Sequence, residues 1–147
     1  MLRLPIEYSY DFNLIGVISS MKEYKLAYHL NKLFNWKLYK VDDVVFTQKK
    51  KSYEYSCYEF VTENIVIMLL KNRCNLFENS SSVNYLLPEL KRYDYLIKIE
   101  SEEYETESDD IVRELQQIAN ISLIETIEIN RLKNRENLIF DYATKKS

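Results

Sequence analysis

The chain has 147 residues, of which 46% are hydrophobic and 29% are charged, and its formal net charge is −3. This length and balance are typical of a globular chain that buries its own core, so we expect one domain over residues 1–147. The acidic balance argues against a dedicated nucleic-acid binder, because such domains are usually basic. A single glycine, Gly16, excludes the glycine-rich loops that hold phosphates in P-loop and dinucleotide-binding proteins.

The supply of metal-binding and nucleophilic side chains is small. Cys57 and Cys74 are the only cysteines and His29 is the only histidine. These three residues cannot form a four-ligand zinc site, and one cysteine pair is not the disulfide framework of a small secreted protein. A catalytic histidine needs an orienting carboxylate and usually a nucleophile, whereas the helical neighbours of His29 are lysines. We therefore expect buried thiols in a reducing compartment, no catalytic residues, no metal and no cofactor.

Neither a secretion signal nor a membrane span is evident. Residues 1–7 carry one positive charge and lack an apolar run, and the longest apolar stretch, residues 65–70, is too short to cross a bilayer. These features predict a cytoplasmic protein that does not enter a membrane.

The first elements predicted are a strand and a helix. Residues 12–19 form a short apolar strand, in which Gly16 indicates a bulge or a close backbone approach. Ser20 is placed to cap a helix that carries Glu23 in its first turn and runs to about Asn35. Apolar side chains at helical spacing predict the face that meets the core, which comprises Leu26, Ala27, Leu30, Leu33 and Phe34.

The middle of the chain predicts a meander. Residues 36–48 offer one or two short strands, residues 53–61 a strand of mixed polarity, and residues 65–71 an almost wholly apolar one. A strand with this last composition is expected to be covered on both faces. Residues 62–64 suit a hairpin turn between the last two strands.

The last third repeats the order strand, helix, strand after a polar loop over 75–84 and a helical turn interrupted at Pro88. In the first of these strands Tyr93, Tyr95, Ile97 and Ile99 point one way, and Asp94 and Lys98 the other. An acidic segment over 100–110 then leads into a helix with Asp109 and Asp110 in its first turn, where negative charge suits the helix dipole. A closing strand over 121–129 precedes a charged C-terminal tail over 133–147.

This order of elements predicts an α+β fold. We expect a two-layer sandwich of a mainly antiparallel sheet and two helices, ferredoxin-like or ACT-like, with an added hairpin.

Two groups of polar residues are candidate binding sites. Lys22, Lys25, His29 and Lys32 form a row along one face of the first predicted helix, able to meet negative charges on a partner. The alternative is an ordinary solvated face.

The acidic segment over 100–110 lacks the residue spacing and the glycine of a calcium-binding loop, so we expect it to be solvated.

The second group lies around the string Leu87-Pro88-Glu89-Leu90-Lys91-Arg92-Tyr93-Asp94-Tyr95. Asp94 lies within an apolar strand, so it must face solvent or find a donor such as Arg92 or a backbone N–H. Two hypotheses remain open: the string is a turn that feeds a core strand, or Asp11, Glu89 and Asp94 gather at one sheet edge as a polar site.

This string resembles the signature of the IPExxxVDY family of small proteins from Bacteroidota. Pro88, Glu89, Asp94 and Tyr95 match the named positions, while Leu87 and Tyr93 replace the isoleucine and the valine. Residues 10–16 and 24–33 are similar to the family's N-terminal strand and helix, and residues 135–140 to its C-terminal end. The resemblance implies a bacterial cytoplasmic protein and adds no catalytic role, because the family has no assigned activity.

These observations predict a non-enzymatic protein-interaction or regulatory domain that binds a protein partner, with the lysine row as the candidate surface. An ACT-like sensor of a small ligand is the alternative, and an RNA-associated protein is a further one. An exposed sheet edge would also allow a homodimer.

Overall fold

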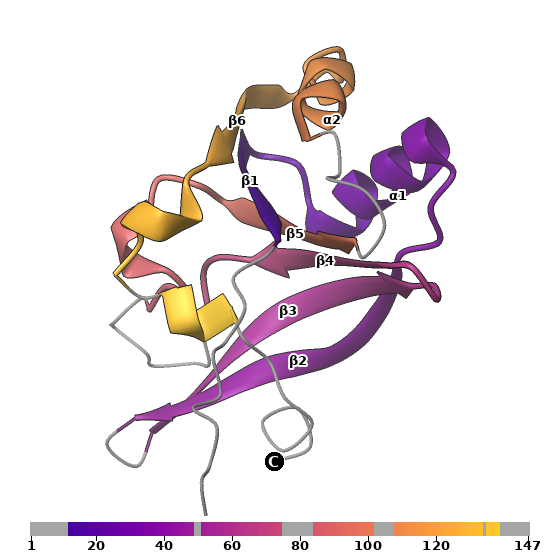
Figure 1. Cartoon of the computed structure of the whole chain (residues 1–147). Helices are drawn as coiled ribbons and strands as arrows, with labels where there is room; N and C mark the ends of the chain where they lie inside the picture. The colour runs from indigo at the N-terminus through magenta and orange to yellow at the C-terminus, as the bar shows by residue number, and fades with distance from the viewer. Residues whose placement is uncertain (1–11, 49–50, 75–83, 102–107, 134, 139–147) are drawn as a thin grey trace, which may run out of the picture.

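The computed structural model describes residues 12–48, 51–74, 84–101, 108–133 and 135–138. These ranges contain two α-helices and one six-stranded sheet (Figure 1). The helices are α1 (Glu23–Phe34) and α2 (Ser108–Leu115). The strands are β1 (Asn13–Ser19), β2 (Tyr39–Gln48), β3 (Lys51–Val61), β4 (Ile65–Lys71), β5 (Tyr95–Ser101) and β6 (Ile121–Ile127).

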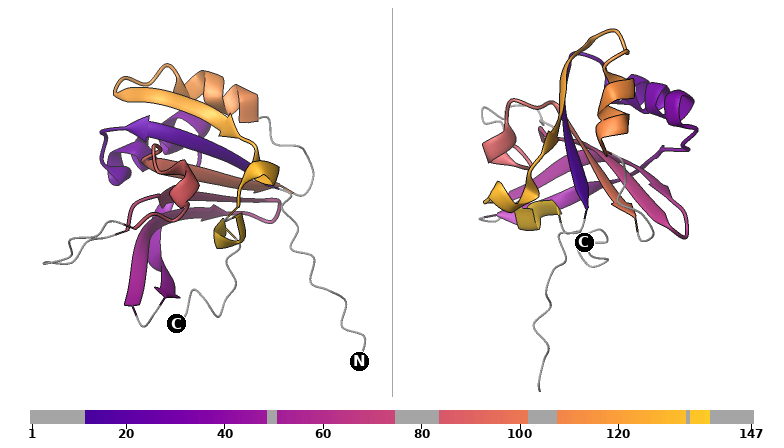
Figure 2. Two further views of the ribbon diagram at one scale, coloured as in Figure 1. Left: turned by 90° about the vertical axis from the view of Figure 1, so that its left-hand side faces the viewer. Right: turned by 45° about the horizontal axis from the view of Figure 1, so that its top comes forward.

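The sheet is antiparallel throughout and has the strand order β2-β3-β4-β5-β1-β6. The long strands β2 and β3 bend strongly, and the sheet curls into a half-barrel (Figures 1 and 2). The predicted order of strands and helices is confirmed, with residues 36–48 contributing one strand rather than two. The sheet is more curved than the two-layer sandwich expected from the sequence.

Both helices lie on the same face of the sheet (Figure 2). Leu26, Ala27 and Leu30 of α1 and Ile111 and Leu115 of α2 are buried in one core cluster with residues of β1, β4 and β5. Leu33 was expected in this stripe but is 38% exposed, so the buried face of α1 is narrower than predicted.

The opposite face of the sheet is buried as well, and this burial extends beyond residues 65–71, the strand for which the sequence predicted it. It is covered by irregular segments and by the short 3-10 turns Pro88–Leu90, Ile129–Arg131 and Arg135–Leu138. Within β4, Ile67 and Leu69 belong to the helix-side core, whereas Met68 and Leu70 belong to this second core. The prediction that residues 65–71 form a strand covered on both faces is therefore confirmed.

Three residues on this second face differ from expectation. Tyr93 packs in the second core and not with Tyr95 and Ile97, because it precedes β5 and does not follow the strand's alternation. Lys98 is 4% exposed and donates from Nζ to the carbonyl oxygen of Leu138 at 2.5 Å, so the polar side of β5 is not solvated. Leu138, within the expected tail, is fully buried.

The two ends of α1 are set by different means. The N-cap residue is Lys22, whose extended backbone makes no side-chain cap, so the predicted cap by Ser20 is wrong. Glu23 does lie in the first turn, as expected. Asn35 ends the helix in the left-handed conformation. Asn31 then bonds both backbone groups of Leu38, at 2.8 and 3.0 Å, and this ties the end of α1 to the start of β2.

The β3–β4 hairpin turn is confirmed in its predicted place. Thr62 N–H donates to the carbonyl oxygen of Ile65 at 2.8 Å, and Thr62 Oγ1 accepts from the N–H groups of Asn64 and Ile65. In the described residues, no helix has the length and apolar character needed to cross a membrane.

Candidate functional site

The outer surface of α1 carries the predicted lysine row together with two tyrosines. Lys22, Lys25 and Lys32 are exposed and His29 is half-buried. Between them, Tyr24 and Tyr28 are 56% and 59% exposed. The helix therefore presents a mixed surface of Tyr24, Lys25, Tyr28 and Lys32, called the α1 surface below.

The side chains of the α1 surface contact one another. The Nζ of Lys32 lies 5.8 Å from the centre of the Tyr28 ring, and the Tyr28 and His29 rings meet edge to face at 5.6 Å. A cation over an aromatic face is attracted by the ring quadrupole, which orders both side chains weakly. The tyrosines were not singled out in the sequence, although their spacing of four residues could have revealed them.

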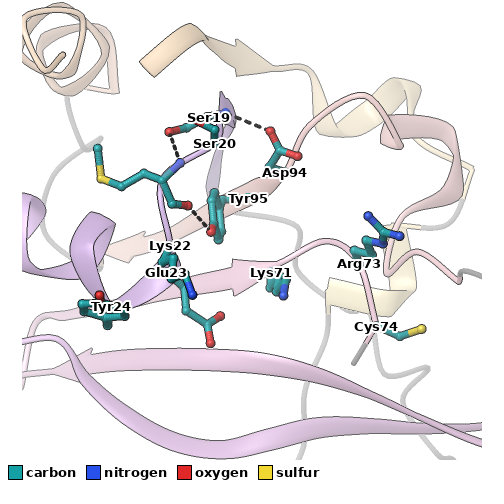
Figure 3. A pocket seen from close by; sticks show the side chains of 11 residues that line it. Ser19, Ser20, Lys22, Glu23, Tyr24, Lys71, Arg73, Cys74, Asp94 and Tyr95 are labelled. Carbon is teal, nitrogen blue, oxygen red and sulfur yellow. Dashed lines mark hydrogen bonds between the residues drawn. The ribbon is translucent and has the colours of Figure 1, made fainter. Parts of the chain in front are cut away.

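A pocket of about 790 Å³ opens at the N-terminal end of α1 (Figure 3). Its walls come from the β1–α1 connection, the end of β4 with the residues after it, and the start of β5. The lining residues are Ser19, Ser20, Met21, Lys22, Glu23, Tyr24, Lys71, Arg73, Cys74, Asp94 and Tyr95. We call this hollow the β1–α1 pocket. It brings together Lys22 of the lysine row and Asp94 of the motif, which lie far apart in the sequence.

Hydrogen bonds from β1 to β5 shape one wall of the pocket. The backbone N–H of Ser19 donates to Oδ2 of Asp94 at 2.8 Å, and Asp94 N–H donates to the carbonyl oxygen of Val17 at 2.9 Å. Of the partners expected for Asp94, the structure shows a backbone N–H and not Arg92. Ser19 Oγ donates to the carbonyl oxygen of Asn120 at 2.6 Å and accepts from Met21 N–H at 3.0 Å. This network holds the chain that leads into α1.

The pocket also contains a buried tyrosine held as a neutral donor. The hydroxyl of Tyr95 donates to the carbonyl oxygen of Met21 at 2.5 Å. Burial, and then the negative charges of Glu23 and Asp94, raises the pKa of Tyr95 to about 12. Both causes disfavour the phenolate, so the Tyr95 hydroxyl is protonated at neutral pH and donates its hydrogen bond to Met21.

The pocket lining contains three cationic side chains and two carboxylates, and the two groups differ in their partners. Lys22, Lys71 and Arg73 form no ion pair within the described ranges. Both carboxylates, by contrast, accept hydrogen bonds: Asp94 from Ser19 N–H, and Glu23 Oε1 from Ser56 Oγ at 2.7 Å. Three cations against two carboxylates leave a formal surplus of one positive charge.

The remaining residues of the motif lie outside the pocket. Oε2 of Glu89 accepts from the backbone N–H of Lys133 at 2.7 Å, and Glu89 does not line the pocket that contains Asp94. Asp11 lies outside the described residues. Leu87 and Tyr93 are buried in the second core. Within what the structure describes, most of the motif therefore serves packing, and Asp94 and Tyr95 alone of it reach the pocket.

A residue that the sequence did not single out organises this motif. Asn72, fully buried, accepts from Leu87 N–H at Oδ1 (2.9 Å) and donates from Nδ2 to the carbonyl oxygens of Leu90 and Tyr93 (2.9 and 3.1 Å). Its own N–H donates to the carbonyl oxygen of Asp94 at 3.0 Å. No sequence pattern marks an asparagine as such a hub, because its partners lie 15 to 22 positions away.

The described residues contain no group of three or more His, Cys, Asp or Glu side chains that could hold a metal ion. Cys57 and Cys74 are both buried free thiols. His29 contacts the Tyr28 ring on the flank of α1, outside the pocket lining. Cys74 lines the β1–α1 pocket, whereas Cys57 and His29 do not.

Comparison with known proteins adds no relative. No family model matches the chain, and no curated protein matches it.

Proposed function

We propose that this chain is a non-enzymatic interaction domain that binds an acidic segment of a partner protein through the α1 surface. The observation that carries the proposal is the pairing of two exposed tyrosines with lysines that have no ion pair in the described part of the chain. Lys25 and Lys32 are the cations of this surface, and Lys22 and His29 lie at its margin.

The composition of the α1 surface supports binding to protein. Tyrosine is enriched at interfaces because it offers a large contact area and loses little side-chain entropy. Exposed lysines without counter-ions attract negative charge and raise the rate of encounter with an acidic partner. The helix is fixed to the sheet by buried Leu26 and Leu30, so the surface is presented without further ordering.

Membership of the IPExxxVDY family is proposed with this function, on the matching Pro88, Glu89, Asp94 and Tyr95. The strand order β4-β5-β1-β6, with α1 after β1 and α2 after β5, supports a ferredoxin-like core to which β2 and β3 are added as a hairpin. The free thiols of Cys57 and Cys74 support a cytoplasmic location.

The test is affinity purification of the tagged protein from its native cells, with and without nuclease. A double variant, Lys25→Glu with Lys32→Glu, is compared with Lys51→Glu and Lys91→Glu. The second pair is also exposed, lies on other elements and changes the net charge equally. We expect one stoichiometric, nuclease-resistant partner that the α1 variant loses and the control variant keeps.

Other outcomes separate the alternatives. A partner kept by the α1 variant, or the protein recovered alone, would refute the proposal. A cargo that disappears with nuclease and weakens steeply with salt would indicate RNA. A stoichiometric second copy, seen as a dimer by light scattering, would indicate self-association instead.

A further inference from the structure

We propose that the β1–α1 pocket is a binding site for a small anion that carries phosphate or carboxylate groups. The site adjoins the proposed protein-binding surface and shares Tyr24 with it, whereas Lys25, Tyr28 and Lys32 do not line it. Its cations come from two distant parts of the chain: Lys22 precedes α1, Lys71 ends β4, and Arg73 lies two residues beyond Lys71.

Three positively charged side chains gather at the pocket. Lys22, Lys71 and Arg73 line one hollow, and none of them has an ion pair in the described ranges. Like charges gathered in one hollow repel one another, and an anion among them removes that repulsion. Ammonium and guanidinium groups bond phosphate and carboxylate oxygens more strongly than they bond neutral acceptors.

The two carboxylates of the pocket offset two of its three positive charges, and one positive charge remains. Asp94 and Glu23 each accept a hydrogen bond within the fold, from Ser19 N–H and from Ser56 Oγ. Those bonds direct the carboxylates to structural roles at the pocket wall. Figure 3 shows Asp94 bonded to the end of β1 while Lys71 and Arg73 extend from the neighbouring segment.

Hydrogen bonds hold the walls of the pocket on both sides. The backbone around Arg73 is held by bonds from Asn72 N–H to the carbonyl oxygen of Asp94 (3.0 Å) and from Cys74 N–H to that of Asn84 (2.8 Å). The other wall is held by the bond from Tyr95 to Met21. A volume of about 790 Å³ lies within the range of small-molecule sites, which is roughly 300–1,000 Å³.

The experiment measures the melting temperature and the backbone amide spectrum of the full chain at constant ionic strength. The probes are inorganic phosphate, pyrophosphate, adenosine monophosphate and citrate. A ligand that binds only the folded state raises the melting temperature as its concentration passes the dissociation constant. We expect at least one probe to give a saturable rise and to shift the amides of residues 19–24 and 71–74. A response to the phosphate compounds but not to citrate would identify phosphate as the bound group, and a response to citrate alone would identify carboxylate.

Variants then locate the site. Lys71→Gln and Arg73→Gln should each weaken the bound probe about tenfold or more. Asp94→Asn keeps an oxygen for Ser19 N–H but removes a negative charge, so it should tighten binding several-fold. Lys51→Gln and Lys91→Gln, at exposed positions outside the pocket and the α1 surface, are the matched controls and should leave probe binding unchanged. Absence of a saturable response to every probe, or equal weakening by the control variants, would overturn the proposal while leaving the α1 surface untested by these data.

Discussion

The ring of Tyr93 fills the space that a side chain on Gly16 would need, on the second face of the sheet. A Cβ atom on Gly16 would lie 2.6 Å from Cδ1 of the Tyr93 ring and 2.8 Å from Cδ1 of Ile127. The glycine is therefore needed for close approach of side chains, and its backbone is not left-handed. The hydroxyl of Tyr93 in turn bonds Glu125 on β6, which also pairs with Arg92.

Gly16→Ala is expected to destabilise the protein by about 1–3 kcal/mol, because the added methyl group overpacks a filled core. The free energy of unfolding, measured by urea titration, tests this. The same substitution in a Tyr93→Leu background should cost less, since the ring that it displaces is gone. An equal cost in both backgrounds would show that the ring is not the obstacle.

Asn72 should be intolerant of substitution. Asn72→Ala leaves a buried N–H and two carbonyl groups without their partner, and each such group costs about 1–3 kcal/mol. Asn72→Asp keeps the acceptor for Leu87 but directs a carboxylate at two carbonyl oxygens. Burial raises the pKa of the introduced carboxyl, so this variant should be least destabilised below about pH 4 and progressively more as pH rises. Equal loss at all pH values would contradict this account.

The buried phenol of Tyr95 predicts a loss of stability at alkaline pH. In the unfolded chain a tyrosine titrates near pH 10, whereas in the fold the pKa of Tyr95 is about 12. The unfolded state therefore loses its proton first, and the contribution present below pH 10 disappears as pH rises toward 12. Its size is on the order of 2 kcal/mol. Burial raises the pKa of Tyr55 too, which adds a loss in the same direction.

Tyr95→Phe isolates this contribution. At pH 7 the variant should be less stable by about 1–3 kcal/mol, because the carbonyl oxygen of Met21 loses its donor. The difference from the unmodified protein should shrink between pH 9.5 and 11, as measured by urea titration at each pH. A difference that stays constant over this range would contradict the assigned pKa shift.

Asn35 tests the end of α1. It has φ 58°, a left-handed conformation that costs a residue with a Cβ roughly 1–2 kcal/mol and costs glycine almost nothing. Asn35→Ala should therefore be less stable than Asn35→Gly by about 1 kcal/mol, as measured by thermal unfolding. At Lys37, an exposed position outside the left-handed region, the same pair of substitutions should not favour glycine.

The elements that sequence patterns predicted are those whose signals are local. The strand over 65–71, the turn over 62–64 and the apolar stripe of α1 follow from spacing within a few residues. The predicted cap by Ser20 is also a local signal, but it is wrong, because tertiary bonds of the neighbouring Ser19 to Asn120 and Asp94 set the path of the chain into the helix.

The amino-acid sequence by itself determined the order of strands and helices, the apolar faces, and the lysine row of α1. Only the tertiary structure decided which segments cover the second face of the sheet, that Asn72 bonds the parts of the motif to one another, and that Lys22, Lys71, Arg73 and Asp94 share one pocket. The physical reason is how far apart in the sequence the interacting residues lie. Periodic burial acts between residues a few positions apart, whereas a buried hydrogen bond or a charged pocket depends on partners that the fold brings together from distant segments.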